Sequence, residues 1–251
     1  MAVSVTTRRL VAQSEVLQWA AMLRVALFDL DDTLYARASG LWPAIGQRIN
    51  LYLTERMGMR ADEAARLRKV YLDTFGTTLN GLRDHYGIDP AEYLAFVHDL
   101  PLERYLEPSP ELSQMLARLP LRKVIFTNAD APHARRVTER LGIADHFERI
   151  VDVHSLDFFA KPDPRAYETV LALTGAAPAE CLFVDDAVRN LVPAHDLGMT
   201  AVLVSPAIDD LPAGIDHQID SILDLEPLLY KIEPGLGWEA QVMAQPGLAE
   251  P

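Results

Sequence analysis

The sequence predicts an α/β protein with a doubly wound parallel sheet and a small inserted α-helical domain. Short apolar runs that do not alternate with polar residues are typical of strands covered on both faces. Four such runs are present, at residues 25–28, 123–126, 181–184 and 200–204, and a weaker one spans residues 149–153. Helical segments separate these runs after short connections, and this alternation favours parallel pairing of the strands.

Four helices are expected in this alternating part, at residues 110–119, 132–141, 164–173 and 187–197. Three of them begin at a proline, which is favoured in the first turn of a helix. Two are followed by Gly142 and Gly198, and glycine is a common residue at the end of a helix.

One long segment, residues 41–106, breaks the alternation. It contains only helical patterns, at residues 42–57, 61–75, 82–86 and 90–98, and we expect it to form a cap above the edge of the sheet. The core then comprises residues 22–40 and 107–229. Residues 1–21 form an N-terminal extension, and residues 230–251, which are rich in proline and glycine, are expected to be a flexible tail.

The composition excludes several classes of protein. Of the 251 residues, 49% are hydrophobic and 24% charged, which excludes a collagen-like, disulfide-scaffold or wholly disordered chain. The net charge is 23 − 36 = −13, and this balance does not suit a nucleic-acid polymer or an anionic membrane as a partner. The lone Cys181 cannot form an internal disulfide, and we expect it to be buried as a small apolar residue.

No segment of the sequence favours insertion into a membrane. The longest stretch free of charge, residues 197–208, has twelve residues and is too short to span a bilayer. Residues 10–23 contain Gln13, Glu15 and Gln18 and make a poor secretory signal, so we expect a cytoplasmic protein. The sequence leaves the oligomeric state open.

Polar residues gather where the predicted strands end. They are Asp29 and Asp31 after the first run, Thr127 and Asn128 after the second, Lys161 before a helix, and Asp185 and Asp186 after the third run. Taken singly, each group is also typical of turns, helix caps or solvated surface. Because the carboxyl ends of parallel strands form one edge of a sheet, where ligands bind, we expect the groups to meet there.

Each group suits a particular chemistry. Asp29 and Asp31 are two residues apart and share one side of an extended chain. Thr127 and Asn128 precede a helix, whose N-terminus favours an oxyanion. A hard cation accounts for both Asp185 and Asp186, because the two adjacent carboxylates have no local basic partner.

These motifs and their order resemble the haloacid dehalogenase-like hydrolase superfamily, whose members are mostly phosphatases. The resemblance covers residues 25–204 and includes Asp29-Leu30-Asp31-Asp32-Thr33, Thr127-Asn128, Lys161 and Asp185-Asp186. Within the superfamily, three stretches resemble the pyrimidine 5′-nucleotidase branch: Phe75-Gly76-Thr77-Thr78-Leu79, Val97-His98-Asp99-Leu100-Pro101 and Phe126-Thr127-Asn128-Ala129-Asp130. The first two lie in the cap, where substrates are selected. The resemblance implies a Rossmann-like hydrolase core.

The resemblance also implies roles for the site residues. Asp29 would be the nucleophile that forms an acyl phosphate, and Asp31 would protonate the leaving oxygen and later activate water. We therefore expect the pKa of Asp31 to lie above that of Asp29. Thr127, Asn128 and Lys161 would hold the phosphoryl oxygens, with Lys161 also offsetting the repulsion among the carboxylates.

The implied cofactor is Mg²⁺. Its ligands would be Asp29, the backbone carbonyl of Asp31, and Asp186, with Asp185 either a direct or a water-mediated ligand. Dehalogenating members of the superfamily lack a carboxylate at the second position and need no metal. The presence of Asp31 therefore favours phosphate chemistry over dehalogenation.

The expected substrate is a pyrimidine nucleoside 5′-monophosphate or a related mononucleotide. Thr78, Asn80, Arg83 and His98 are polar candidates in the cap, and we expect Asn80 or Arg83 to contact the base or the ribose. The alternatives are a general phosphatase for phosphoglycolate-like or sugar phosphates and, more remotely, a catalytically silent binding protein. We expect His133 to lie in the first turn of a helix and predict no other role for it.

Overall fold

The computed structural model describes residues 23–208 and 210–234, and their centre is a six-stranded parallel sheet. The strands are β1 (Val25–Phe28), β2 (Arg122–Phe126), β3 (Arg149–Val151), β4 (Cys181–Asp185), β5 (Thr200–Val204) and β6 (His217–Ile219). Their spatial order is β3-β2-β1-β4-β5-β6, so β1 lies between β2 and β4. The strand order reverses beside β1, and ligands bind at such a reversal in open α/β sheets.

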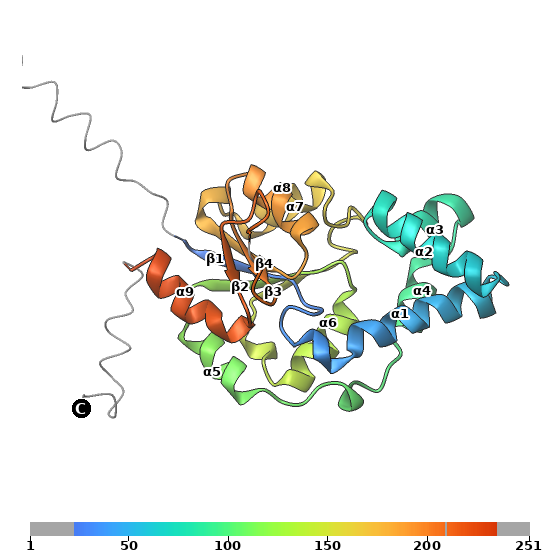
Figure 1. Ribbon diagram of the computed structural model, residues 1–251, viewed down its shortest axis with the longest axis horizontal. Helices are drawn as coiled ribbons and strands as arrows, with labels where there is room; N and C mark the ends of the chain where they lie inside the picture. Colours follow the sequence, from blue (N-terminus) through green and yellow to red (C-terminus); the bar gives the residue numbers. More distant parts are fainter. Residues whose placement is uncertain (1–22, 209, 235–251) are drawn as a thin grey trace, which may run out of the picture.

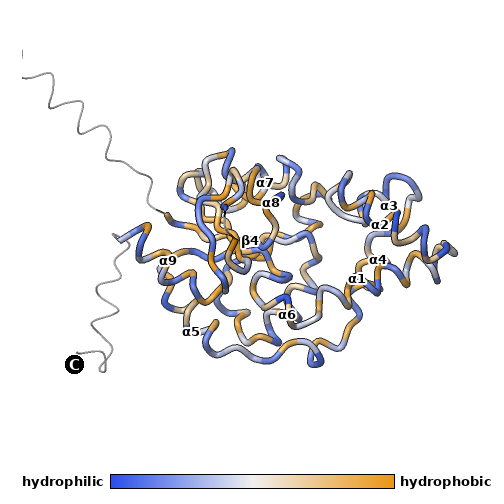
Figure 2. The backbone as a smooth tube through the Cα atoms, in the orientation of Figure 1, coloured by the Kyte–Doolittle hydropathy of each residue, from blue (hydrophilic) through white to orange (hydrophobic). Residues whose placement is uncertain are grey.

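Helices cover both faces of the sheet, as the unbroken apolar runs predicted (Figure 1). On one face lie α5 (Pro110–Arg118), α6 (Ala131–Leu141) and α9 (Leu225–Ile232), and on the other lie α7 (Pro164–Thr174) and α8 (Val188–Asp196). Along β1, Ala26 and Phe28 are buried against the first group, whereas Val25 and Leu27 are buried against the second. Figure 2 shows the resulting concentration of hydrophobic residues in the central strands. The predicted doubly wound α/β fold is confirmed.

The inserted helices form a separate group at the right of Figure 1. They are α1 (Leu41–Leu51), which continues into a π-helical turn at Tyr52–Arg56, and then α2 (Ala61–Phe75), α3 (Thr78–Tyr86) and α4 (Pro90–Val97). We call these the cap helices. They bury an apolar cluster of their own, which includes Tyr71, Leu82 and Tyr93. A Cβ atom on Gly81 would lie 2.3 Å from the ring of Tyr71, so this close packing of α2 and α3 requires a glycine.

Several elements differ from the sequence-based expectation. Strand β6 and helix α9 were not predicted, and α9 continues to Ile232, beyond the expected start of the tail at residue 230. Helix α3 begins at Thr78 rather than at residue 82, because the Thr77 hydroxyl caps it by accepting the Asn80 N–H at 3.1 Å.

Some predictions lie beyond the part of the chain that the structure describes. The extension at residues 1–21 falls wholly outside it, as do residues 235–251 of the tail. The domain boundaries at residues 41 and 106 stay a prediction. None of the helices between residues 23 and 234, with residue 209 left aside, is long and apolar enough to cross a membrane.

Candidate active site

The loop after β1 places two carboxylates at the edge of the sheet. The Asp29 N–H still donates to the Val184 carbonyl at 2.9 Å, and the chain then turns, with Asp32 at a φ of 61°. Aspartate tolerates this left-handed conformation better than most residues. The N–H groups of residues 30–32 donate to no residue that the structure describes. They are therefore free to bind an anion beside Asp29.

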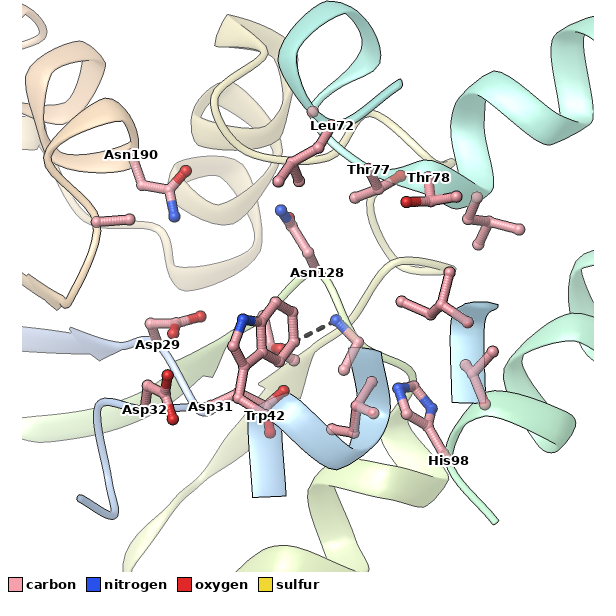
Figure 3. Close-up of a pocket in the computed structure, with 18 of the residues that line it drawn as sticks. Asp29, Asp31, Asp32, Trp42, Leu72, Thr77, Thr78, His98, Asn128 and Asn190 are labelled. Carbon is pink, nitrogen blue, oxygen red and sulfur yellow. Dashed lines mark hydrogen bonds between the residues drawn. The ribbon is translucent and has the colours of Figure 1, made fainter. Parts of the chain in front are cut away.

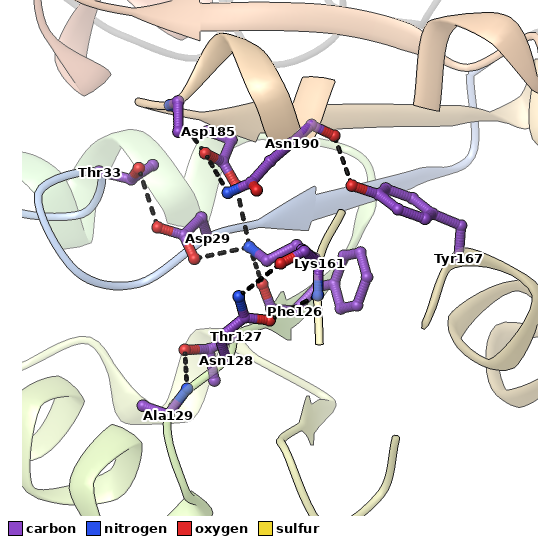
Figure 4. Close-up of polar contacts among 11 residues, drawn as sticks. Asp29, Thr33, Phe126, Thr127, Asn128, Ala129, Lys161, Tyr167, Asp185 and Asn190 are labelled. Carbon is purple, nitrogen blue, oxygen red and sulfur yellow. Dashed lines mark hydrogen bonds and ion pairs between the residues drawn. The ribbon is translucent and has the colours of Figure 1, made fainter. Parts of the chain in front are cut away.

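Lys161 neutralises this edge from within the core (Figure 4). Its side chain is 1% exposed, and its ammonium group donates to Asp29 Oδ1 at 2.7 Å, to the Phe126 carbonyl at 2.7 Å and to Asp185 Oδ2 at 2.9 Å. Burial alone would lower the pKa of Lys161, but the charges of Asp185 and Asp29 outweigh it and raise the pKa. Lys161 therefore stays charged where the strands β1, β2 and β4 end.

The two adjacent aspartates after β4 have different environments. Asp185 is fully buried, and its oxygens accept bonds from the Ala187 N–H at 2.8 Å and from Asn190 Nδ2 at 3.0 Å, in addition to Lys161. Asp186 is partly exposed, and its closest ionic partner among the described residues is Arg37, at 3.6 Å. Burial, followed by the charge of Asp185, raises the pKa of Asp186 to about 6. Asp186 therefore has oxygens free for a cation, whereas the oxygens of Asp185 are occupied.

This cluster fits a small hard cation. Single carboxylate oxygens of Asp29, Asp185 and Asp186 lie within 4.8 Å of one another. Carboxylate oxygens and water are the ligands that Mg²⁺ prefers, usually with only one or two carboxylates from the protein. A cation here would also relieve the repulsion that raises the pKa of Asp186. Asp29 and Asp186 would bind it directly, and Asp185 would position Lys161 instead.

Thr127 and Asn128 reach the same edge from β2. Thr127 is buried, and its hydroxyl oxygen accepts the Ala129 N–H at 3.0 Å. The Asn128 side chain is committed to the backbone of Lys161: Oδ1 accepts its N–H at 2.8 Å, and Nδ2 donates to its carbonyl at 3.0 Å. The Thr127 hydroxyl hydrogen and the Asn128 backbone N–H donate to none of the described residues, so these groups are free to bind a phosphoryl oxygen.

The pKa order of the two catalytic candidates differs from the expectation. Burial raises the pKa of Asp29 well above its ordinary value, and the charges of Asp185 and Asp186 raise it further. The charge of Lys161 lowers this pKa but offsets the increase only in part. For Asp31, burial acts in the same direction, but His133 and the Tyr35 hydroxyl outweigh it and lower the pKa. The expectation that Asp31 has the higher pKa is therefore wrong for the protein with no cation at this site. A bound cation would itself stabilise the charged form of Asp29.

No role for His133 was predicted from the sequence. This residue lies in the first turn of α6, and its Nε2 lies 3.0 Å from Asp31 Oδ1. One signal was present: α6 follows the Thr127-Asn128 motif, so its N-terminus points at the same edge of the sheet. Polar side chains in its first turn were therefore candidates for the site.

A cavity of about 330 Å³ lies between the core and the cap helices (Figure 3). Asp29, Asp31 and Asp32 lie on one side of it, and Leu72, Thr77 and Thr78 lie on the opposite side. Core residues of the site, Thr127, Asn128 and Asp186 among them, also line it. Apolar and aromatic cap residues and three arginines contribute further lining: Trp42, Ile45, Ile49, Leu79, Tyr93, Leu94, Val97, Arg37, Arg68 and Arg189. Two of the four polar cap candidates, Thr78 and His98, line this cavity.

Asn80 and Arg83 are not brought to the cavity. Asn80 Nδ2 donates to the Phe158 carbonyl at 2.8 Å, and the Arg83 guanidinium lies 3.8 Å from the centre of the Phe158 ring. Both side chains thus hold α3 against the loop that leads to Lys161. Gly76 makes a further close approach there, because a Cβ atom on it would lie 3.0 Å from the Lys161 carbonyl.

Comparison with known proteins agrees with this site. The model of a family described as haloacid dehalogenase-like hydrolase matches residues 23–198. The chain belongs to this family of hydrolases.

Two curated relatives and one solved structure illustrate the similarity. Phosphate metabolism protein 8 of Saccharomyces cerevisiae is 33% identical over 195 residues, which cover 72% of this chain and 61% of that protein. Glyceraldehyde 3-phosphate phosphatase of Methanothermobacter thermautotrophicus is 24% identical over 217 residues, covering 81% of this chain and 94% of its own. L-2-haloacid dehalogenase of Xanthobacter autotrophicus superposes with a TM-score of 0.54 at 20% identity, over 84% of this chain and all of that chain, and this shows a shared fold alone. Relatives of this chain thus include a phosphatase.

Proposed function

We propose that this chain is a Mg²⁺-dependent phosphomonoester hydrolase that acts through a phosphoryl-Asp29 intermediate. The observation that carries the proposal is the position of Asp29, 2.7 Å from the buried Lys161 ammonium and beside Asp186, with a second carboxylate, Asp31, facing the same cavity. A dehalogenase has no use for that second carboxylate. A silent binding protein would have no need to bury a lysine between two aspartates.

The residues of the chain divide the reaction among them. Asp29 attacks phosphorus, while the Asn128 N–H and the free N–H groups of residues 30–32 hold the phosphoryl oxygens. Lys161, whose three N–H donors are already bonded to Asp29, Asp185 and the Phe126 carbonyl, attracts these oxygens through its positive charge. Removing one such donor typically costs about 3 kcal/mol in the barrier. Mg²⁺, held by Asp29, the Asp31 carbonyl and Asp186, would neutralise the negative charge that accumulates on the phosphoryl oxygens.

Asp31 supplies the proton for the leaving oxygen. Its pKa is low in the free protein, but a phosphate dianion beside it disfavours the charged carboxylate and therefore raises that pKa. Substrate binding thus favours the protonated acid that the first step needs. After the leaving group departs, the same carboxylate accepts a proton from the attacking water.

We propose pyrimidine nucleoside 5′-monophosphates, or related mononucleotides, as substrates. The cavity is large enough for a small ligand and has an aromatic side chain, Trp42, among apolar cap residues that suit a planar base. Asn80 and Arg83 would support this binding only indirectly, by holding the cap. The similarity to glyceraldehyde 3-phosphate phosphatase favours a second candidate, a phosphatase for small metabolites.

Phosphate release from a panel of phosphomonoesters tests these proposals. The panel is UMP, CMP, AMP, phosphoglycolate, glyceraldehyde 3-phosphate and a sugar phosphate, each with Mg²⁺ and with EDTA, beside the Asp29→Asn variant. Mg²⁺-dependent release that favours UMP and CMP supports both the reaction and the substrate. Faster turnover of the small metabolites would replace the nucleotide proposal, and no metal-dependent release from any of them would overturn the hydrolase proposal.

A further inference from the structure

The Asp31 carboxyl is held through only one of its oxygens. The Tyr35 hydroxyl donates to Oδ1 at 2.6 Å, and His133 Nε2 donates to the same oxygen at 3.0 Å. Oδ2 accepts no hydrogen bond from any residue that the structure describes, although Asp31 lines the cavity. The two oxygens are therefore not equivalent: one is bonded to the protein, and the other is left for the substrate.

His133 is itself held firmly. Its side chain is fully buried, and its ring stacks on that of His98 with centroids 4.1 Å apart and an angle of 17° between the planes. His98 Nδ1 donates to Asp130 Oδ1 at 2.8 Å, and the same oxygen accepts the His133 N–H at 3.3 Å. His133 Nδ1 has no partner within the described part of the chain, so the only side-chain hydrogen bond of this imidazole is the one to Asp31.

The stacked histidines lie where the cap rejoins the core. His98 directly follows α4, the last of the cap helices. From α6, Arg136 donates to the carbonyl of His98 at 2.9 Å and to that of Leu100 at 2.6 Å. The position of the His133 ring is thus set both by its own helix and by the returning cap segment.

We propose that Tyr35 and His133 are positioning residues that reserve Asp31 Oδ1 as an acceptor, so that Oδ2 is the oxygen that carries and transfers the proton. This inference rests on the proposed phosphatase reaction. As the phosphorus–oxygen bond of the substrate breaks, its electron pair passes to the leaving oxygen, which takes the proton from Oδ2 and leaves Asp31 as a carboxylate. Oδ2 then accepts a proton from the water that attacks phosphoryl-Asp29, and the electron pair of that second bond returns to the Asp29 carboxylate.

A series of leaving groups tests the inference. We would measure kcat/KM for 2,4-dinitrophenyl, 4-nitrophenyl, phenyl and ethyl phosphate with the wild type, Tyr35→Phe, His133→Ala and His133→Gln. General-acid catalysis is worth about 10²–10⁴-fold, and a good leaving group needs little of it. We expect Tyr35→Phe and His133→Ala to lose about tenfold or more on ethyl and phenyl phosphate beyond their loss on dinitrophenyl phosphate. His133→Gln, whose amide can still donate to Oδ1, should recover part of that difference.

The control is His195→Ala, which removes an exposed histidine bonded to Asp216 and absent from the cavity. It should leave kcat/KM unchanged for every ester. Equal losses across the whole series in Tyr35→Phe and His133→Ala would overturn the inference, because a merely structural defect does not depend on the leaving group. Tyr35→Phe deletes a single hydroxyl and carries the test alone if His133→Ala does not fold. If the wild type releases phosphate neither from these esters nor from the panel of nucleotides and metabolites, the proposed function fails and the inference fails with it.

Discussion

Replacing Lys161 with methionine tests how the buried charges hold the site together. The substitution keeps a long side chain but removes the only positive charge among the described groups within hydrogen-bond distance of Asp29 and Asp185. Removing one partner of a buried ion pair costs about 3–5 kcal/mol, because the remaining charge is left in a poorly solvating interior. For a chain of this size each kcal/mol lowers the melting temperature by about 2–4 °C, so Lys161→Met should melt about 6–20 °C below the wild type.

The assay is thermal unfolding followed by circular dichroism, with Lys69→Met as the matched control. Lys69 forms an exposed pair with Asp73 at 2.8 Å, four residues along α2, and such pairs contribute only about 0.5 kcal/mol or less. The phosphatase rate of Lys161→Met should also fall about 10²–10³-fold, because the preorganised positive charge beside Asp29 and the hydrogen bond that positions this carboxylate are lost. A melting temperature equal to that of Lys69→Met would show that Lys161 does not compensate the two buried carboxylates.

Four further predictions concern the cap (two of them), the histidine pair and the cysteine. Asn80→Ala loses its bond to the Phe158 carbonyl, so kcat/KM should fall by a similar factor for nucleotides and for small phosphate esters. A loss confined to nucleotides would show instead that Asn80 contacts the nucleotide directly. Trp42→Ala should instead reduce the preference for nucleotides, measured as the ratio of kcat/KM for UMP to that for phosphoglycolate. Burial, and then the charge of His133, lowers the pKa of His98, so the folded protein favours the neutral form of His98. The stability that this neutral residue contributes is therefore full above the ordinary histidine pKa of about 6.5 and is lost as the pH falls below that value. The melting temperature should therefore decrease from pH 7 to pH 5, and less steeply in His98→Asn; equal slopes would contradict this. Burial raises the pKa of the Cys181 thiol to about 11, so a thiol reagent should label it at pH 7 only when the protein unfolds. Rapid labelling of the native protein would contradict the burial of this thiol.

The strands that hold the site were predictable from sequence because they are short, apolar and buried on both faces. The polar residues that follow β1, β2 and β4 could be assigned to one edge by the same logic, since parallel strands end together. Strand β6 was missed because its three residues, His217, Gln218 and Ile219, carry no apolar run. Helix α9 was missed because turn-forming residues after position 230 drew the predicted boundary of the tail through it.

Sequence alone could not say which side chains of the cap reach the substrate. Successive residues of a helix are rotated by about 100°, so Thr78 and Asn80 point about 200° apart on α3. One lines the cavity and the other bonds to Phe158, and only tertiary packing decides which. The contact between Asp31 and His133 likewise joins residues 102 positions apart, a pairing that no local pattern encodes.

Detection of the phosphoryl enzyme is the decisive test of whether Asp29 is the nucleophile. The protein would be mixed with Mg²⁺ and a phosphomonoester that it hydrolyses, quenched in acid within milliseconds, digested and examined by mass spectrometry. We expect one phosphoryl group on the peptide that contains Asp29, removed by hydroxylamine and absent from Asp29→Asn. Release of phosphate with that peptide unmodified at every quench time, or a phosphoryl group on another residue, would contradict it.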